Sequence, residues 1–214
     1  CDTCGARGMS GLRERKKRDV RDALYAAAIA QIEANGYEAV SVDQIVQAVG
    51  VAKGTFFNHF PSKADIVAEW YSRLIGKTLA EYRPGRARGL ASQLVHLALM
   101  SNRLSQAAPA LWRAKNALAV SSAAIQAAER EGDAAIEKFA HTLVAGAMAR
   151  REIRADVDAA AFARLYTSLV TGAVRQWIVV GGGAGLERRL RDRVATLCQL
   201  AAPGLASGAS PGQK

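Results

Sequence analysis

The chain has 214 residues, a formal net charge of +10 and an apolar share of 50%. This length allows one large domain or two small ones with a sizeable buried core. Arg, Gln or Gly interrupts each long apolar run well before the roughly 20 residues that a membrane span needs, and we recognise no secretory leader. Because alanine is also abundant, we expect a mainly helical, soluble and cytoplasmic protein that has no membrane partner.

The positive charge suits a protein that binds a polyanion, although most of the excess lies in the C-terminal part. Near the N-terminus, a basic arm is well placed to meet phosphates or a minor groove. Its residues are Arg13, Arg15, Lys16, Lys17 and Arg18. The alternative for this arm is a solvated start of the first helix. Four arginines between positions 188 and 193 are interpreted as a solvated face.

The first helix is predicted over residues 13–35, after a disordered extension at 1–12. Its apolar residues recur at helical spacing, and Asn35-Gly36 supplies a C-terminal cap. The extension holds one CxxC pair without a second pair, which is only a weak indication of zinc. We predict neither a metal site nor a cofactor.

Residues 41–60 have the pattern of two short helices joined by a turn. The apolar residues of the first helix recur at the i, i+3, i+4 and i+7 positions of one face. They are Val42, Ile45, Val46 and Val49. Gly50 follows where a turn needs a positive φ. In the second helix, Phe56 and Phe60 are four positions apart and point to the same side, which leaves the other positions for the surface.

Helix starts in this segment carry capping signals. Ser41 and Gln44 match the S-x-x-Q capping box, in which the hydroxyl accepts from a first-turn amide and the Gln side chain returns to the cap. Ser41 is therefore a simple cap, a phosphate contact, or both. Ser62 and Asp65 form a second capping box, so the positive N-terminus of the next helix and Lys63 together make an anion site for a DNA phosphate.

From about Arg18 to Tyr71, the sequence resembles the N-terminal DNA-binding domain of the TetR family of bacterial transcriptional regulators. The blocks GY, S-V-x-x-I, G-V-x-K-G-T-F and H-F-x-S-K occur at fixed intervals and carry this resemblance. The resemblance implies an all-α fold of about nine helices. Residues 13–62 would form a three-helix helix-turn-helix DNA-binding domain, residues 63–202 a helical effector-binding and dimerisation domain, and residues 203–214 a disordered tail.

The same resemblance implies a ligand-inducible repressor that binds a pseudo-palindromic operator in double-stranded DNA as a homodimer. The implied DNA contacts are Ser41, Lys53, Gly54, Thr55, Phe57, Asn58, His59 and Lys63. Lysines, Thr55 and His59 would contact phosphates, Gly54 would allow close backbone approach, and Thr55, Phe57 and Asn58 would lie nearest to base edges. Phe57 stands where the family usually has Tyr, which removes a phenolic hydrogen bond. Ala52 stands where Ser is common, which removes a helix cap.

In the C-terminal part, predicted helices end near residues 82, 106, 112, 151, 180 and 202, with breaks at Pro84-Gly85 and GGGAG. The last two helices resemble the family's dimer interface, and ordinary core within one chain is the alternative. The interface residues would be Tyr166, Leu169, Val170, Trp177, Leu190, Val194 and Leu197. A mostly apolar effector pocket is also implied, although each candidate for it is equally at home in a core. The candidates are His96, Met100, Trp112, Phe139, Met148 and Arg175.

The sequence leaves two rival functions. An enzyme is disfavoured, because the three histidines are scattered, no G-x-S-x-G is present, and GGGAG follows a predicted helix where a phosphate-binding loop would follow a strand. A ligand-independent regulator or an accessory DNA-organising protein is the second rival. The effector, the operator sequence and the sign of regulation are not encoded in recognisable residues.

Overall fold

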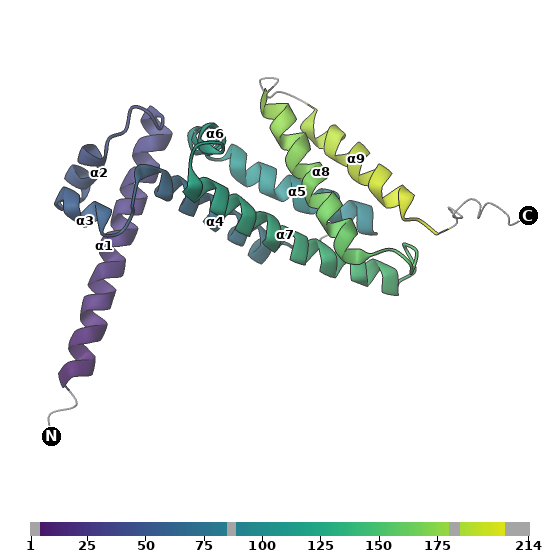
Figure 1. Ribbon diagram of the computed structural model, residues 1–214, viewed down its shortest axis with the longest axis horizontal. Helices are drawn as coiled ribbons and strands as arrows, with labels where there is room; N and C mark the ends of the chain where they lie inside the picture. The colour runs from purple at the N-terminus through teal and green to yellow at the C-terminus, as the bar shows by residue number, and fades with distance from the viewer. Residues whose placement is uncertain (1–4, 85–88, 180–184, 204–214) are drawn as a thin grey trace, which may run out of the picture. The chain divides into compact units, whose positions relative to one another are not determined.

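The computed structural model describes residues 5–84, 89–179 and 185–203, and all of the regular structure in these ranges is helical (Figure 1). This confirms the expected all-α fold. The helices are α1 (Gly5–Asn35), α2 (Val42–Val49), α3 (Lys53–Phe57), α4 (Lys63–Glu81), α5 (Leu90–Gln106), α6 (Pro109–Leu118), α7 (Ala123–Ala149), α8 (Ala159–Val179) and α9 (Leu186–Leu200).

The chain divides into two compact units. The first contains residues 1–73 and 105–129, and the second contains residues 74–104 and 130–214. Both α4 and α7 therefore contribute to each unit, and α6 lies wholly within the first. The sequence prediction instead assigned everything from residue 63 to 202 to one C-terminal domain. Contacts between α1 and α6 account for this difference.

Several helix boundaries differ from their predictions. α1 begins at Gly5, so residues 5–12 are helical and the predicted disordered extension is wrong for them. Ala6, Arg7 and Met9 favour a helix here, whereas the three glycines of this segment oppose it. α3 is a short helix, whereas α6 runs well beyond its predicted end at Trp112 because further turns bury alanine and lysine side chains. Gly85, most of GGGAG and the tail from 204 lie outside the described residues.

The core of the first unit is built on one face of α1. Leu24, Ala28 and Ile32 are fully buried along this face. Their spacing of four residues aligns them on one side of the helix. α2 and α3 pack next to one another and α2 packs on α1, where Ile45 and Phe56 add fully buried side chains. These contacts hold the helix-turn-helix as a rigid body.

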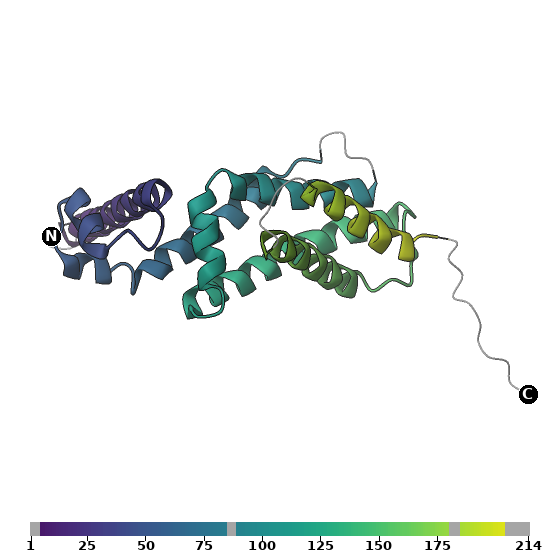
Figure 2. The same ribbon diagram turned by 90° about the horizontal axis from the view of Figure 1, so that it is seen from above.

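The second unit is a helical bundle in which α8 and α9 lie side by side (Figures 1 and 2). Leu94 of α5, Val144 of α7 and Tyr166 of α8 are among its buried side chains. The Tyr166 hydroxyl donates a hydrogen bond to the Leu94 carbonyl at 2.8 Å, and burial raises the pKa of this phenol. In the described parts of the chain, no helix is both long enough and apolar enough to cross a bilayer.

Candidate DNA-binding site

The first helix of the helix-turn-helix is capped as predicted. Ser41 Oγ accepts a hydrogen bond from the Gln44 amide at 3.2 Å, and Gln44 Oε1 accepts from the Ser41 amide at 2.7 Å. At the other end, Gly50 has a φ of 74° and its amide donates to the Val46 carbonyl at 2.9 Å. Such caps contribute about 1 kcal/mol each, so the start and end of α2 are well defined.

α3 divides its side chains between the core and solvent. Phe56 and Phe60 are buried, as their spacing predicted, with 0% and 1% of their surface exposed. Phe57 is 49% exposed, and its ring meets the Phe56 ring edge-on with 5.4 Å between centroids. The Phe57 ring thus packs against Phe56 on one side and is exposed to solvent on the other. The other predicted contacts here are exposed or partly exposed, namely Lys53, Gly54, Thr55, Asn58 and His59.

Gly54 is not required by the protein's own packing. A Cβ atom at this position would meet no heavy atom within 4 Å. Its φ lies outside the left-handed region, so the backbone conformation does not demand glycine either. Glycine in a helix is normally less stable than alanine by about 0.5–1 kcal/mol. A partner that approaches the backbone closely would explain why this position lacks a side chain.

Lys53 begins α3 with its charge toward solvent. Its ammonium lies 2.9 Å from the Asp43 carboxylate of α2, and both side chains are more than half exposed. An exposed pair of this kind contributes little to stability and is readily exchanged for another anion. The preceding residue, Ala52, makes no side-chain cap, as the sequence predicted.

Lys63 is engaged within the protein, which the sequence did not predict. Its Nζ donates to the carbonyl oxygens of Tyr37 at 2.5 Å and Val40 at 2.6 Å. It also lies 4.0 Å from the centre of the Tyr37 ring. Burial lowers the pKa of this ammonium. Lys63 therefore stabilises the loop between α1 and α2 through the carbonyl groups of Tyr37 and Val40.

His59 lies just after α3 and is partly exposed. Burial lowers the pKa of its imidazole, and the nearby charges of Lys17 and Arg21 lower it further. The ring is therefore neutral at pH 7, where it offers one N–H donor.

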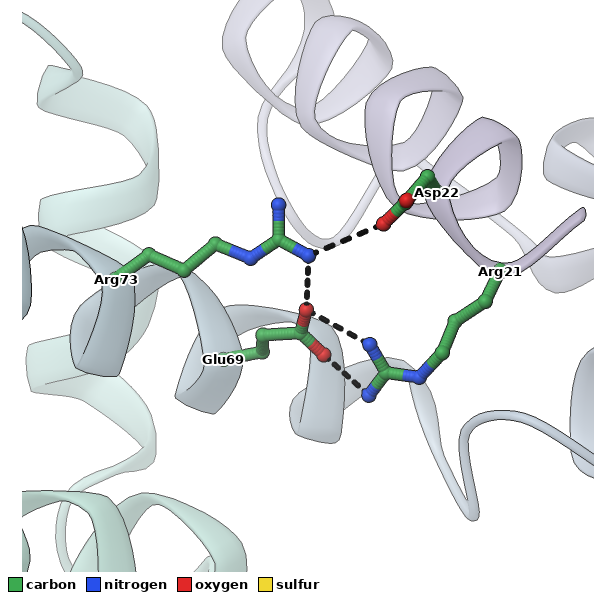
Figure 3. A network of polar contacts seen from close by, with 4 residues as sticks. All are labelled: Arg21, Asp22, Glu69 and Arg73. Carbon is green, nitrogen blue, oxygen red and sulfur yellow. Dashed lines mark hydrogen bonds and ion pairs between the residues drawn. The ribbon is translucent and has the colours of Figure 1, made fainter. Parts of the chain in front are cut away.

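A network of charged side chains joins α1 to α4 (Figure 3). Arg21 Nη1 donates to Glu69 Oε1 at 2.8 Å, and its second amino group also pairs with this carboxylate. Arg73 Nη2 donates to the same Oε1 at 2.5 Å and lies 3.3 Å from Asp22. Glu69 thus holds two guanidinium groups that come from different helices. This arrangement joins α1 to the part of α4 that belongs to the first unit.

The electrostatics of Glu69 follow from this network. Burial raises the pKa of its carboxyl, but the hydrogen bonds from Arg21 and Arg73 outweigh burial and bring the pKa below its ordinary value. Glu69 is therefore ionised at neutral pH. Sequence analysis missed the network, because 48 positions separate Arg21 from Glu69 and only the packed helices bring them together.

The predicted effector-pocket residues belong to different parts of the structure. His96 and Phe139 both contact Tyr82, with ring centroids 5.5 and 5.0 Å apart respectively. Met100 and Met148 are partly buried and pack against the same hydrophobic core of the second unit. His96 and Phe139 therefore lie beside Tyr82, which is buried in this core.

The remaining two pocket candidates are Trp112 and Arg175, and the effector pocket stays a prediction. Trp112 belongs to the first unit, where its ring lies 6.3 Å from both Trp70 and Tyr71. Arg175 is exposed on α8. The second unit also has a cavity of about 340 Å³ that sequence analysis missed. Its lining includes Leu90, Ser92, Glu152, Ile153, Ala195 and Cys198.

The predicted dimer residues fall into two groups. Tyr166, Leu190 and Val194 are buried inside the chain's own core, so the prediction that they face a partner is wrong and the alternative of intrachain core holds for them. The physical reason is that α9 uses its apolar stripe to cover α8. The other four, Leu169, Val170, Trp177 and Leu197, are only partly buried. Leu165 of α8 is 59% exposed.

The described residues contain no group of three or more His, Cys, Asp or Glu side chains arranged to hold a metal ion. Cys198 is partly buried on α9, and burial raises the pKa of its thiol to about 11. A thiol with such a pKa is protonated at neutral pH and a poor nucleophile. Cys198 is therefore a small apolar side chain in this bundle.

Comparisons with known proteins agree with the helix-turn-helix geometry. Residues 24–70 match the model of the bacterial regulatory proteins of the tetR family. Over 76 residues, the chain is 43% identical to the HTH-type transcriptional regulator TcmR of Streptomyces glaucescens, a match that covers 35% of this chain. The matched part spans 34% of TcmR, about a third of that protein.

Solved structures extend the likeness to most of the chain. FadR of Thermus thermophilus, a TetR-family transcriptional repressor in complex with lauroyl-CoA, has a TM-score of 0.68 and 18% identity, covering 91% of this chain and 99% of FadR. A TetR-family regulator from Cytophaga hutchinsonii has a TM-score of 0.67 and 15% identity, covering 88% and 97% of the two chains. At these identities, the likeness establishes the fold alone.

The fold and the exposed face of α3 define a helix-turn-helix DNA-binding protein. Residues 24–70 match the model of the bacterial regulatory proteins of the tetR family. This part of the chain therefore carries a DNA-binding domain of that family, similar to the matching segment of TcmR.

Proposed function

We propose that the protein is a ligand-inducible repressor that binds a pseudo-palindromic operator as a homodimer. The observation that carries this proposal is the outward face of α3, where a glycine without a packing role lies beside an exposed aromatic ring and an exposed amide. Two such helices related by a twofold axis would occupy successive major grooves about 34–36 Å apart. A symmetric dimer would therefore read an operator with two similar half-sites.

Side chains around α3 would hold the DNA backbone. Lys53 would exchange its exposed partner Asp43 for a phosphate, since the exchange costs little. Lys63 would use its third donor, and Ser41 and Thr55 would use their hydroxyls. His59 would donate an N–H from its ring. Contacts to phosphates fix register and orientation but carry little sequence information.

Base recognition would come from three neighbouring positions. An Asn amide can pair with both the N6 and N7 groups of adenine, which makes Asn58 the best candidate for hydrogen-bonded recognition. Phe57 would contact a thymine methyl, and the Thr55 methyl could do the same. Gly54 would let the backbone of α3 come close enough to the groove for these short contacts.

Dimerisation through α8 and α9 is supported by their partly exposed apolar residues. Leu165 is the most exposed of these on α8, and Leu169, Val170, Trp177 and Leu197 are partly buried. An interface core needs apolar and aromatic side chains that the protomer does not itself cover. These five residues meet that requirement. Tyr166, Leu190 and Val194 would lie beneath them in the core of the protomer.

A small-molecule effector would bind in the second unit, where Tyr82, His96 and Phe139 meet. The Thermus thermophilus FadR structure holds lauroyl-CoA, which supports a ligand that acts on this fold. Since α4 begins in the first unit and ends in the second, a tilt of its last turns would also move Lys63. An effector that prefers the DNA-incompetent dimer about 100-fold would supply about 3 kcal/mol of coupling.

The test begins with selection of bound fragments from genomic DNA, followed by footprinting of the purified protein on the selected sites. Protection of one discrete palindrome supports a specific regulator, whereas general coating contradicts the operator. Compounds related to the genes that flank the site are then titrated with and without operator DNA. Because coupling is reciprocal, DNA must weaken effector binding by the same factor, and equal affinities would rule out induction.

A further inference from the structure

The buried face of α1 continues toward the N-terminus as a row of positive charges. Within the unit, this face carries Leu24 and Ala28, both fully buried. Toward the N-terminus, the same face carries Arg21, Lys17 and Arg13 at intervals of four residues, because residues four apart lie above one another on a helix. We call Arg13 and Lys17 the basic stripe.

Arg21 shows where this face points. Its guanidinium lies 4.6 Å from the centre of the Phe60 ring, immediately after α3, and it pairs with Glu69. One turn further out, the charge of Lys17 acts on His59 and lowers its pKa together with Arg21. The basic stripe therefore starts beside the helix-turn-helix. It lies on the same side of α1 as α3.

Beyond Arg21, α1 runs on past the rest of the unit (Figure 1). All residues from 11 to 19 are exposed, so no protein surface covers this part of the helix. If another element packed on this face, we would expect apolar side chains there. The face instead carries cationic side chains. Among the described residues, neither Arg13 nor Lys17 has an acidic partner within ion-pair distance. Their like charges at i and i+4 destabilise the helix by about 0.2–0.5 kcal/mol.

The other side of the same helix segment has a different character. There, Arg18 follows Glu14 by four residues and Arg15 precedes Asp19 by four, a spacing at which opposite charges attract. Arg15 and Arg18 thus each have an acidic residue four positions away, whereas the residues four positions from Lys17 are Arg13 and Arg21. A polyanion placed along the stripe would offset the repulsion between Arg13 and Lys17.

We propose that Arg13 and Lys17 form a second phosphate-binding surface, which holds the DNA backbone next to the groove that α3 occupies. This inference rests on the proposed binding of α3 to DNA. Two flexible cationic side chains without fixed hydrogen-bond partners suit phosphates better than base edges. A lipid surface fits less well, because a membrane-bound helix needs an apolar face opposite its charges, and the described start of α1 offers only Leu12 as a large exposed apolar side chain.

The test compares two double variants that lose the same charge from the same helix. Arg13→Gln with Lys17→Gln removes the stripe, and Arg15→Gln with Arg18→Gln removes two charges from the other side. Binding of the full-length protein to a fluorescein-labelled, mixed-sequence DNA duplex is measured over a range of salt concentrations. The stripe variant should bind more weakly at low salt, with the slope of log K against log salt reduced by about 0.9 for each phosphate that the protein no longer neutralises.

The control variant should keep the slope of the wild type, and Lys17→Arg, which keeps the charge, should keep it as well. Thermal unfolding of each variant checks that the fold is intact. Equal changes in both double variants, or no change in either, would contradict phosphate binding by the basic stripe. That result would not contradict DNA binding by α3. Failure of the wild type to bind any duplex would overturn both proposals. Loss of binding to anionic phosphatidylserine vesicles, with DNA binding unchanged, would assign the stripe to a membrane instead.

Discussion

The carboxylate of Glu33, near the end of α1, accepts a hydrogen bond from the backbone amide of Leu111 in the first turn of α6, with 2.7 Å between the two atoms. A helix N-terminus has unpaired amides and partial positive charge, so a carboxylate there is stabilising on both counts. Leu111 is itself fully buried. The contact binds α6 to the DNA-binding helices within the first unit.

Replacing Glu33 by alanine should lower the free energy of unfolding by about 1–2 kcal/mol, since the Leu111 amide would have no partner in a partly buried place. Glu33→Gln keeps an acceptor oxygen and should cost less. Urea unfolding followed by circular dichroism measures both. Equal losses in the two variants would show that the hydrogen bond is not what stabilises the contact.

Replacing Gly54 by alanine should separate stability from function. The fold should be unchanged or more stable by up to about 1 kcal/mol, because alanine favours helix and the space is open, whereas DNA affinity should fall as the new methyl group holds α3 away from the groove. Gly76→Ala is a matched control, since Gly76 is also exposed on a helix with open space around it. The control should gain stability without losing affinity, as band shifts can test.

The two lysines should behave differently. Lys53→Ala should reduce the salt slope of DNA binding by about 0.9 per phosphate contact and weaken specific and non-specific binding equally, with stability unchanged, because its ion pair is exposed. Lys63→Ala should reduce DNA affinity and stability together, because the carbonyls of Tyr37 and Val40 would be left without their donor. Unchanged salt slopes in both variants would contradict the phosphate assignments.

Phe57 should influence sequence preference more than affinity for DNA in general. Phe57→Ala should relax the preference at one or two positions of each half-site, since alanine is too short to reach a thymine methyl. Phe57→Tyr should tighten binding by adding a hydrogen bond to a phosphate. Site selection with both variants measures the preference, and identical profiles and affinities would mean that this ring does not face DNA.

The Glu69 network should make the free energy of unfolding depend on pH in the acidic range. The folded-state pKa of Glu69 lies below its ordinary value, so its contribution is present at neutral pH and lost as the pH falls below about 4.3 through the folded pKa. Glu69→Gln should therefore be less stable than the wild type at pH 7 by about 1–2 kcal/mol, since both arginines stay partly hydrated. The difference should shrink in acid, and a constant difference between pH 7 and pH 3 would contradict the network's role.

Local signals in the sequence predicted the helix-turn-helix well. The Ser41–Gln44 capping box, the positive φ of Gly50 and the burial of Phe56 and Phe60 all depend on residues within a few positions of each other. Contacts between distant segments could not be predicted in this way. The partners in the Glu33–Leu111 bond are 78 positions apart, and neither residue carries a motif.

Two further errors have physical causes. α8 is apolar around most of its circumference, so periodicity alone could not say which of its faces meets α9 and which stays open for a partner. Tyr166 was therefore assigned to the outside although its hydroxyl bonds inside to Leu94. Lys63 was expected to be a free cation, because the sequence does not show that the loop carbonyls of Tyr37 and Val40 point at its ammonium.

The composition of the first unit also bears on how the protein is made. Residues up to Arg73 leave the ribosome first, but the unit is complete only when the segment up to Glu129 has followed. At about 5–20 residues per second, this interval lasts several seconds. Trp70 and Tyr71, which Trp112 of α6 covers in the finished unit, are uncovered for that time. A nascent chain paused between α4 and α6 would thus present an aromatic surface that a chaperone can bind.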